Sequence, residues 1–189
     1  ETRPANSGCL GNAEQMGEGW SDYYSFMMTT NWASVQPTDG AQNRGIGTYV
    51  IGQNPVTGRG IRTYAYSNNL SINPWNFSQL SSIPTGRPHT VGEIWCATLW
   101  DMTWELIGVD GINRNFFNPN GVGGNSVAMK LVTEAMKLQP CGPGFLDGRD
   151  AILKADSIFF NGRYRCAIWN AFARRGMGAG AVQGSSNSL

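Results

Sequence analysis

Histidine is almost absent from this 189-residue sequence, which contains a single one, His89. A zinc site with three histidine ligands, or any motif that needs two histidines, therefore cannot be built from this chain alone. Charged side chains are also scarce, at 14% against the ~25% typical of globular proteins, and the net charge is only +1. This balance gives no electrostatic reason to expect nucleic acid or an anionic membrane as a partner.

Long apolar runs are missing as well, because polar residues interrupt the best candidate, 94–99, far short of the ~18–20 residues of a membrane span. The cysteines Cys9, Cys96, Cys141 and Cys166 form no Cys-x-x-Cys pair, which argues against a structural zinc site. A disulfide between Cys141 and Cys166 is expected, with two separate thiols as the alternative. Eleven arginines, three lysines and loops rich in Asn, Gly, Ser and Thr are compatible with a secreted protein.

Hydrophobic residues make up 41% of the sequence, which is enough for the core of one domain spanning 1–189. Apolar residues at helical spacing predict five helices in this domain. These helices are expected over 12–32, 88–109, 125–138, 149–159 and 164–175, with Asn12 as the cap of the first and Glu14 in its first turn.

The stretch between the first two helices is rich in glycine and proline and reads as long loops. Two β-like runs, 47–51 and 61–66, are separated by turn residues and predict a small β-hairpin. The Gly/Ser-rich end, 180–189, is expected to be a flexible tail. The predicted fold is therefore mainly α, with about five helices, long loops and one hairpin.

Glu18 and Asp22 lie four residues apart, so both carboxylates would project from one face of the first helix. Two like charges in this arrangement repel, and a metal ion or a protonated histidine would relieve the conflict. The plain alternative is a solvated acidic face. Gly17 and Gly19 cost the helix about 1 kcal/mol each, which indicates close packing or a nearby site.

The segment 16–22, Met-Gly-Glu-Gly-Trp-Ser-Asp, resembles the glutamate-ligand motif of the fungalysin-type (M36) zinc metallopeptidases, relatives of thermolysin. Further blocks in the family's order are similar, namely 6–10, 87–95, 137–141 and 147–153, the last two especially to the bacterial branch. The resemblance implies a thermolysin-like C-terminal helical lobe. It also implies a secreted zinc-dependent endopeptidase acting on peptides or proteins.

The resemblance implies a role for individual positions. Glu18 would be the third zinc ligand, Asp22 would orient an imidazole ligand, and His89 would donate to the oxyanion of the transition state. Arg62, on a shorter match, would bind a substrate carbonyl oxygen near the primed-side pocket. Glu93 follows His89 by one turn and either orients it or is a plain surface residue of the helix.

The family's His-Glu-x-x-His helix, which carries two zinc ligands and the general base, has no counterpart here. The chain is therefore expected to be the C-terminal part of a catalytic domain, with the N-terminal part as its partner, and to be inactive in isolation. The alternative is a non-catalytic peptide- or carbohydrate-binding module with Trp32 and Trp75 exposed. A His-Glu-x-x-His motif encoded shortly upstream of Glu1 would distinguish the two.

Zinc is the cofactor that the resemblance implies for the intact enzyme. Calcium stays open, because several aspartates fall in or near loops but no spacing resembles an EF-hand. These aspartates are Asp39, Asp110, Asp147 and Asp150.

Overall fold

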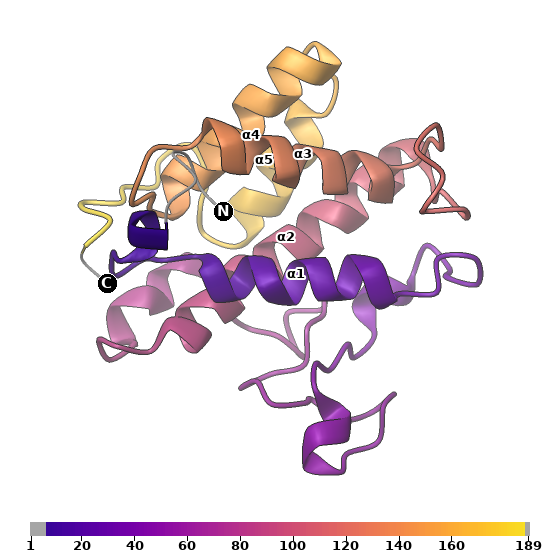
Figure 1. Cartoon of the computed structure of the whole chain (residues 1–189), viewed down its shortest axis with the longest axis horizontal. Helices are drawn as coiled ribbons and strands as arrows, with labels where there is room; N and C mark the ends of the chain where they lie inside the picture. The colour runs from indigo at the N-terminus through magenta and orange to yellow at the C-terminus, as the bar shows by residue number, and fades with distance from the viewer. Residues whose placement is uncertain (1–6, 188–189) are drawn as a thin grey trace.

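The computed structural model describes residues 7–187, and in this part of the chain five α-helices form a mainly helical fold (Figure 1). The helices are α1 (Gly17–Thr29), α2 (Pro88–Asp110), α3 (Gly124–Leu138), α4 (Phe145–Phe160) and α5 (Arg165–Arg174). Four short 3₁₀ helices lie outside them: η1 (Ser7–Leu10), η2 (Asp39–Ala41), η3 (Thr48–Ile51) and η4 (Phe77–Ser82). The prediction of a mainly α fold with about five helices is confirmed.

Helix α2 lies at the centre of the fold and packs against α1, α3 and α5, while α3 also packs against α4. Nearly every position of α2 from Val91 to Leu106 is buried, as expected for a helix that is apolar on all sides. Pro88 occupies its first turn, where the missing N–H costs nothing. Gly111, with a φ of 70°, ends the helix.

Helix α1 begins at Gly17, five residues later than predicted, because tertiary bonds use the residues expected to start it. Asn12 does not cap the helix, since its side chain donates to the carbonyl of Pro143 at 2.9 Å. Glu14 does not lie in the first turn, since its carboxylate accepts from the N–H of Phe145 at 2.9 Å. The segment before α1 is thus tied to the beginning of α4.

The predicted hairpin is wrong, because no strand forms within the described residues and the first run folds as η3. Gly47 and Gly52 flank η3 with φ of 63° and 64°, left-handed values that curl the chain instead of extending it. Two isolated bridges form in this region, an antiparallel one between Arg44 and Tyr66 and a parallel one between Ile46 and Gly60. A Cβ on Gly60 would lie 1.9 Å from the carbonyl oxygen of Ile46. The segment forms the irregular loops below the helices in Figure 1.

The predicted Cys141–Cys166 disulfide is also wrong, because Cys141 is bonded to Cys9. The N–H of Gly142 donates to the carbonyl of Cys9 at 2.9 Å, so η1 lies against the turn before α4. Cys166 is an exposed free thiol on α5, and Cys96 is a buried one. Proximity along the sequence was a poor guide, since closing a longer loop costs little more entropy.

The end of the described chain is bonded to the beginning of α4. The amide of Gln183 accepts from the N–H of Leu146 at 2.7 Å and donates to Asp147 at 2.9 Å. The carbonyl of Ser186 accepts from the N–H of Glu14 at 3.0 Å. The flexibility expected of 180–189 stays a prediction, and 188–189 lie outside the described residues.

The tryptophans mostly serve the core. Trp95 and Trp104 are buried, and Trp169 lies half-buried beneath the guanidinium of Arg149. Trp32, predicted to be exposed, is only 2% exposed and packs against Trp104 and Phe116. No helix in the described part of the chain combines the length and apolarity required to cross a lipid bilayer.

Candidate active site

The candidate site lies where α1 and α2 approach most closely, at Gly19 and Gly92. A Cβ on Gly19 would lie 2.4 Å from the carbonyl oxygen of Gly92, and a Cβ on Gly92 would lie 2.5 Å from the nitrogen of Gly19. Only glycine allows the two backbones to come this close. The close contact accounts for Gly19, though not for Gly17, and it brings the beginnings of the two helices together.

Glu18 and His89 meet beside this crossing. Oε2 of Glu18 lies 2.8 Å from Nδ1 of His89. The side chain of Glu18 is 36% exposed and that of His89 is 63% exposed, so both groups are accessible from solvent. Nε2 of His89 makes no hydrogen bond within residues 7–187, which leaves it available to a ligand. Glu18 and His89 are 71 positions apart in the sequence, and the packing of α1 against α2 brings them into contact.

Asp22 lies one turn further along α1 and faces the interior. Its carboxylate accepts two hydrogen bonds of 2.7 Å from Nε and Nη2 of Arg62, in the bidentate geometry that suits a guanidinium. The hydroxyl of Tyr66 donates to it at 2.6 Å. Asp22 is only 3% exposed, so these partners compensate its burial. The two carboxylates expected on one face therefore have different surroundings.

Arg62 connects the two carboxylates. Its Nη2 lies 3.6 Å from Oε2 of Glu18 while it remains bonded to Asp22. The hydrogen bonds that Arg62 donates to Asp22 raise the pKa of Arg62 above its usual value, so the guanidinium stays charged. Burial raises the pKa of Tyr66 well above its usual value, so that phenol stays neutral and serves as a donor. A cation thus lies behind the exposed carboxylate.

Four residues singled out in the sequence therefore gather in one place: Glu18, Asp22, Arg62 and His89. Glu93 has neither of the positions expected for it. It is 4% exposed, and its carboxylate accepts from the backbone of Thr63 and the indole of Trp75, not from His89. Tyr66, Thr63 and Trp75 also belong to the site, although nothing in the sequence singled them out as members of it. No local pattern indicates them, because their partners lie 18 to 44 residues away.

The described residues do not complete a metal site. No group of three His, Cys, Asp or Glu side chains in residues 7–187 is arranged to hold a metal ion. Within the candidate site, Glu18 is the carboxylate that solvent can reach, and it could serve as one metal ligand. A zinc site needs three protein ligands, so Glu18 by itself is not sufficient. The arrangement does offer one accessible carboxylate, with an imidazole nitrogen at 2.8 Å and a charged guanidinium nitrogen at 3.6 Å from the same oxygen.

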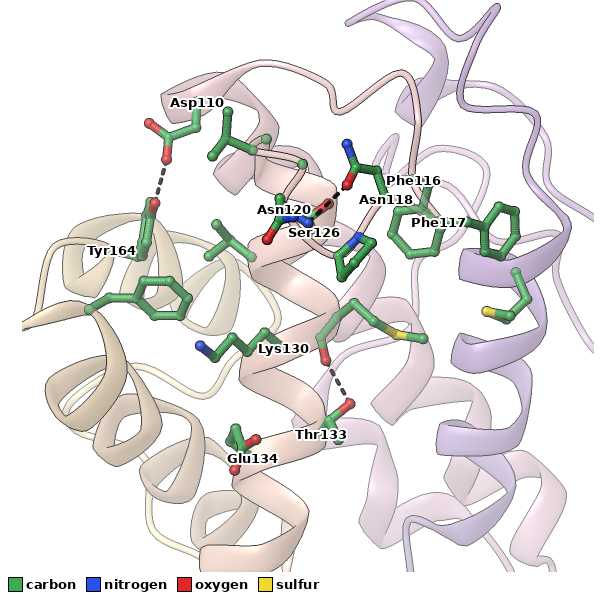
Figure 2. A pocket seen from close by; sticks show the side chains of 18 residues that line it. Asp110, Phe116, Phe117, Asn118, Asn120, Ser126, Lys130, Thr133, Glu134 and Tyr164 are labelled. Atoms are coloured by element: carbon green, nitrogen blue, oxygen red, sulfur yellow. Dashed lines mark hydrogen bonds between the residues drawn. The ribbon is translucent and has the colours of Figure 1, made fainter.

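A cavity of about 680 Å³ lies at the opposite end of α2, where Asp110 ends the helix. Figure 2 shows it between α3, the loop that carries Phe117, and the turn with Tyr164, whose hydroxyl donates to Asp110. A smaller hollow of about 470 Å³ lies between residues 10–15 and the first turn of α2. Neither cavity is lined by Glu18 or His89.

Comparison with known proteins identifies relatives over nearly the whole chain. The sequence matches the family model described as Fungalysin metallopeptidase (M36) over residues 2–181. Extracellular metalloproteinase 3 of Trichophyton tonsurans is 40% identical over 190 residues, covering 97% of this chain and 28% of the relative. Extracellular metalloproteinase 2 of Arthroderma gypseum is 36% identical over 190 residues, with the same two shares covered.

A third relative, Extracellular metalloproteinase MEP of Leptosphaeria maculans, is 40% identical over 185 residues, covering 94% of this chain and 28% of the relative. The chain thus spans little more than a quarter of the length of these relatives. All three are fungal, so they do not support the bacterial branch expected from the sequence.

Proposed function

The chain belongs to the fungalysin (M36) metallopeptidase family, and from that membership we propose that it is the C-terminal portion of a secreted, zinc-dependent endopeptidase. Its relatives are named extracellular metalloproteinases, and the family implies zinc as the cofactor and peptides or proteins as substrates. The observation that carries the proposal is the 2.8 Å contact between Glu18 and His89, with Arg62 at 3.6 Å from the same carboxylate oxygen.

Glu18 is the zinc ligand that this chain contributes, and the two other ligands and the general base come from a preceding part of the catalytic domain. Zinc in such a site polarises the scissile carbonyl and lowers the pKa of a bound water. The exposure of Glu18 supports this assignment, because a ligand at an interface between two lobes must be reachable from outside its own lobe.

His89 and Arg62 act on the substrate. The imidazole of His89 donates a hydrogen bond to the oxyanion that develops in the transition state, and Nε2 faces no competing partner in the described residues. Arg62 binds a substrate carbonyl oxygen on the primed side through Nη1, which makes no hydrogen bond within residues 7–187. Asp22 holds the guanidinium in place through its two 2.7 Å bonds.

Substitutions at the two exposed groups test the proposal in the longer protein that contains this chain. Glu18→Gln is expected to lower zinc affinity by at least about 100-fold, because even residues that only support a zinc ligand contribute 10- to 100-fold. His89→Ala is expected to lower kcat by about 100-fold or more with little change in KM, because its hydrogen bond strengthens in the transition state.

Metal analysis and peptide-hydrolysis kinetics measure both effects. Glu134→Gln, which removes a carboxylate paired with Lys137 on α3, is the control and is expected to change neither quantity. Retention of zinc and full activity by Glu18→Gln would contradict the assignment. The 189-residue chain by itself is expected to bind zinc weakly and to hydrolyse nothing, so zinc-dependent hydrolysis by it would overturn the two-part site. Absence of a His-Glu-x-x-His motif upstream would favour a non-catalytic module instead.

A further inference from the structure

Glu93 is a buried carboxylate that the proposed chemistry does not use. It lies on α2, one turn after His89, and is only 4% exposed. Its two oxygens accept from the backbone N–H of Thr63 at 3.0 and 3.1 Å, and the indole Nε1 of Trp75 donates to it at 2.8 Å. The hydroxyl of Thr63 adds a bond of 3.2 Å. The burial of this charge is therefore compensated by donors from two different loops.

The peptide group that Glu93 holds directly follows Arg62. On its other side, Nη1 of Arg59 donates to the carbonyl of Arg62 at 2.6 Å and to the carbonyl of Thr63 at 3.0 Å. The backbone at Arg62 is thus bonded from both sides, while its guanidinium is bonded to Asp22. Arg62 has little freedom to move as long as these bonds persist.

Trp75 is itself fixed by a second buried network. Arg175 is fully buried and donates to the carbonyls of Trp75 and Asn73, each at 2.8 Å. The other edge of its guanidinium is paired with Asp101 on α2 at 2.8 and 2.9 Å. The donor that Trp75 presents to Glu93 is therefore anchored to the same helix that carries Glu93.

A buried carboxylate stabilises a loop only after its desolvation free energy has been offset, and well-packed apolar residues often stabilise a loop equally well without that penalty. The geometry offers a reason for this one. Glu93 and His89 lie on adjacent turns of one helix, so a bond from Glu93 to the loop sets the position of Arg62 relative to His89 and, through the Gly19–Gly92 contact, to Glu18.

We infer that Glu93 is a positioning residue of the peptidase, which acts through Thr63 to hold Arg62 where it meets the substrate carbonyl. The inference rests on the proposed function of Arg62 and goes beyond it, since Glu93 itself touches no substrate. Arg59 assists by bonding the same peptide unit from the solvent side.

The test is Glu93→Gln in the longer, zinc-loaded protein. Glutamine is neutral and keeps only one acceptor oxygen, so that oxygen must serve both Thr63 and Trp75, and both bonds lose the strength that the negative charge adds. KM is expected to rise about 10-fold with kcat changed by no more than about threefold, because Arg62 contacts a carbonyl that does not react and so contributes binding shared by ground and transition states. In an Arg62→Ala background, Glu93→Gln is expected to raise KM no further.

Tyr23→Phe is the matched control. It removes a buried hydrogen bond of 3.1 Å to Thr103 between α1 and α2, and it is expected to lower thermal stability without changing KM. An equal rise of KM in Tyr23→Phe, or additive effects of Glu93→Gln and Arg62→Ala, would reduce Glu93 to a structural role and overturn the inference. An active wild type with an unchanged Glu93→Gln variant would overturn this inference alone. A wild type that hydrolyses no peptide would overturn the proposed function with it.

Discussion

At the scale of single residues, Glu14 is a carboxyl group whose surroundings disfavour its charged form. It is 2% exposed, and burial raises its pKa from 4.5 to about 7, although the bond from the N–H of Phe145 works in the opposite direction. The neighbouring carboxylate of Asp147 raises the pKa further. The folded state therefore holds a proton that the unfolded state releases between pH 4.5 and 7, and stability falls as the pH rises through this range.

Glu14→Gln imitates the protonated carboxyl at every pH. We expect the variant to match the wild type at pH 4, where both are neutral, and to exceed it in unfolding free energy by about 3 kcal/mol at pH 8. Urea denaturation at several pH values measures the difference. Glu105→Gln on α2, which is partly exposed, is the control and is expected to leave the pH profile unchanged. Parallel profiles for Glu14→Gln and wild type would contradict the prediction.

The residues of the candidate site could be singled out from the sequence only where a motif carried them. The block around Glu18 and Asp22 and the block around His89 were found through their resemblance to a family, and the structure brings both together with Arg62. Glu93 was noticed, but its partners were not, because hydrogen bonds to Thr63 and Trp75 depend on how two loops fold against α2. Spacing along the chain contains no information of that kind.

At the scale of elements, the contact between α1 and α2 decides where the site lies. The helices themselves followed from apolar periodicity, and α2 begins at the predicted residue. The conformation of the segment between α1 and α2 could not be predicted from that periodicity. Its backbone is determined by left-handed glycines such as Gly47 and by contacts such as that of Gly60 with Ile46. A run of β-branched and aromatic residues is no guide where such turns curl the chain.

Gly19→Ala tests the importance of this contact. The new Cβ would lie 2.4 Å from the carbonyl oxygen of Gly92, a backbone atom that cannot move by itself, so we expect a loss of about 1–3 kcal/mol in unfolding free energy. Gly108→Ala in α2 is the matched control. Its Cβ would meet nothing within 4 Å on an exposed face, and helix propensity predicts a gain of about 0.5–1 kcal/mol. Equal effects of the two substitutions in chemical denaturation would contradict close packing at Gly19.

At the scale of the whole molecule, covalent and hydrogen bonds join distant parts of the chain at the beginning of α4. Cys9 is bonded to Cys141, Asn12 to Pro143 and Glu14 to Phe145, while Gln183 reaches the same place from the other end of the chain. The sequence left Cys9 without a partner, because pairing across 132 residues depends on the complete fold.

Removal of this disulfide by the double substitution of Cys9 and Cys141 with Ser is expected to lower the unfolding free energy by up to about 5 kcal/mol, because the bond closes a loop of more than 130 residues in the unfolded chain. Chemical denaturation measures the loss. Cys166→Ser is the control, with no change in stability and loss of the thiol that reacts in the native protein. Peptide mapping that linked Cys141 to Cys166 would contradict the pairing.

The same bond has a topological consequence. Residues 9–141 form a covalent ring that includes Glu18, Arg62 and His89, whereas α4 and α5 lie outside it. The exposed loops around η3, with Tyr49 and Val50 turned to solvent, are part of this ring. A single backbone nick in those loops would open the ring without releasing a fragment, and the two pieces would come apart only under reducing conditions. A chain closed in this way remains one covalent molecule after a first proteolytic cut within the ring.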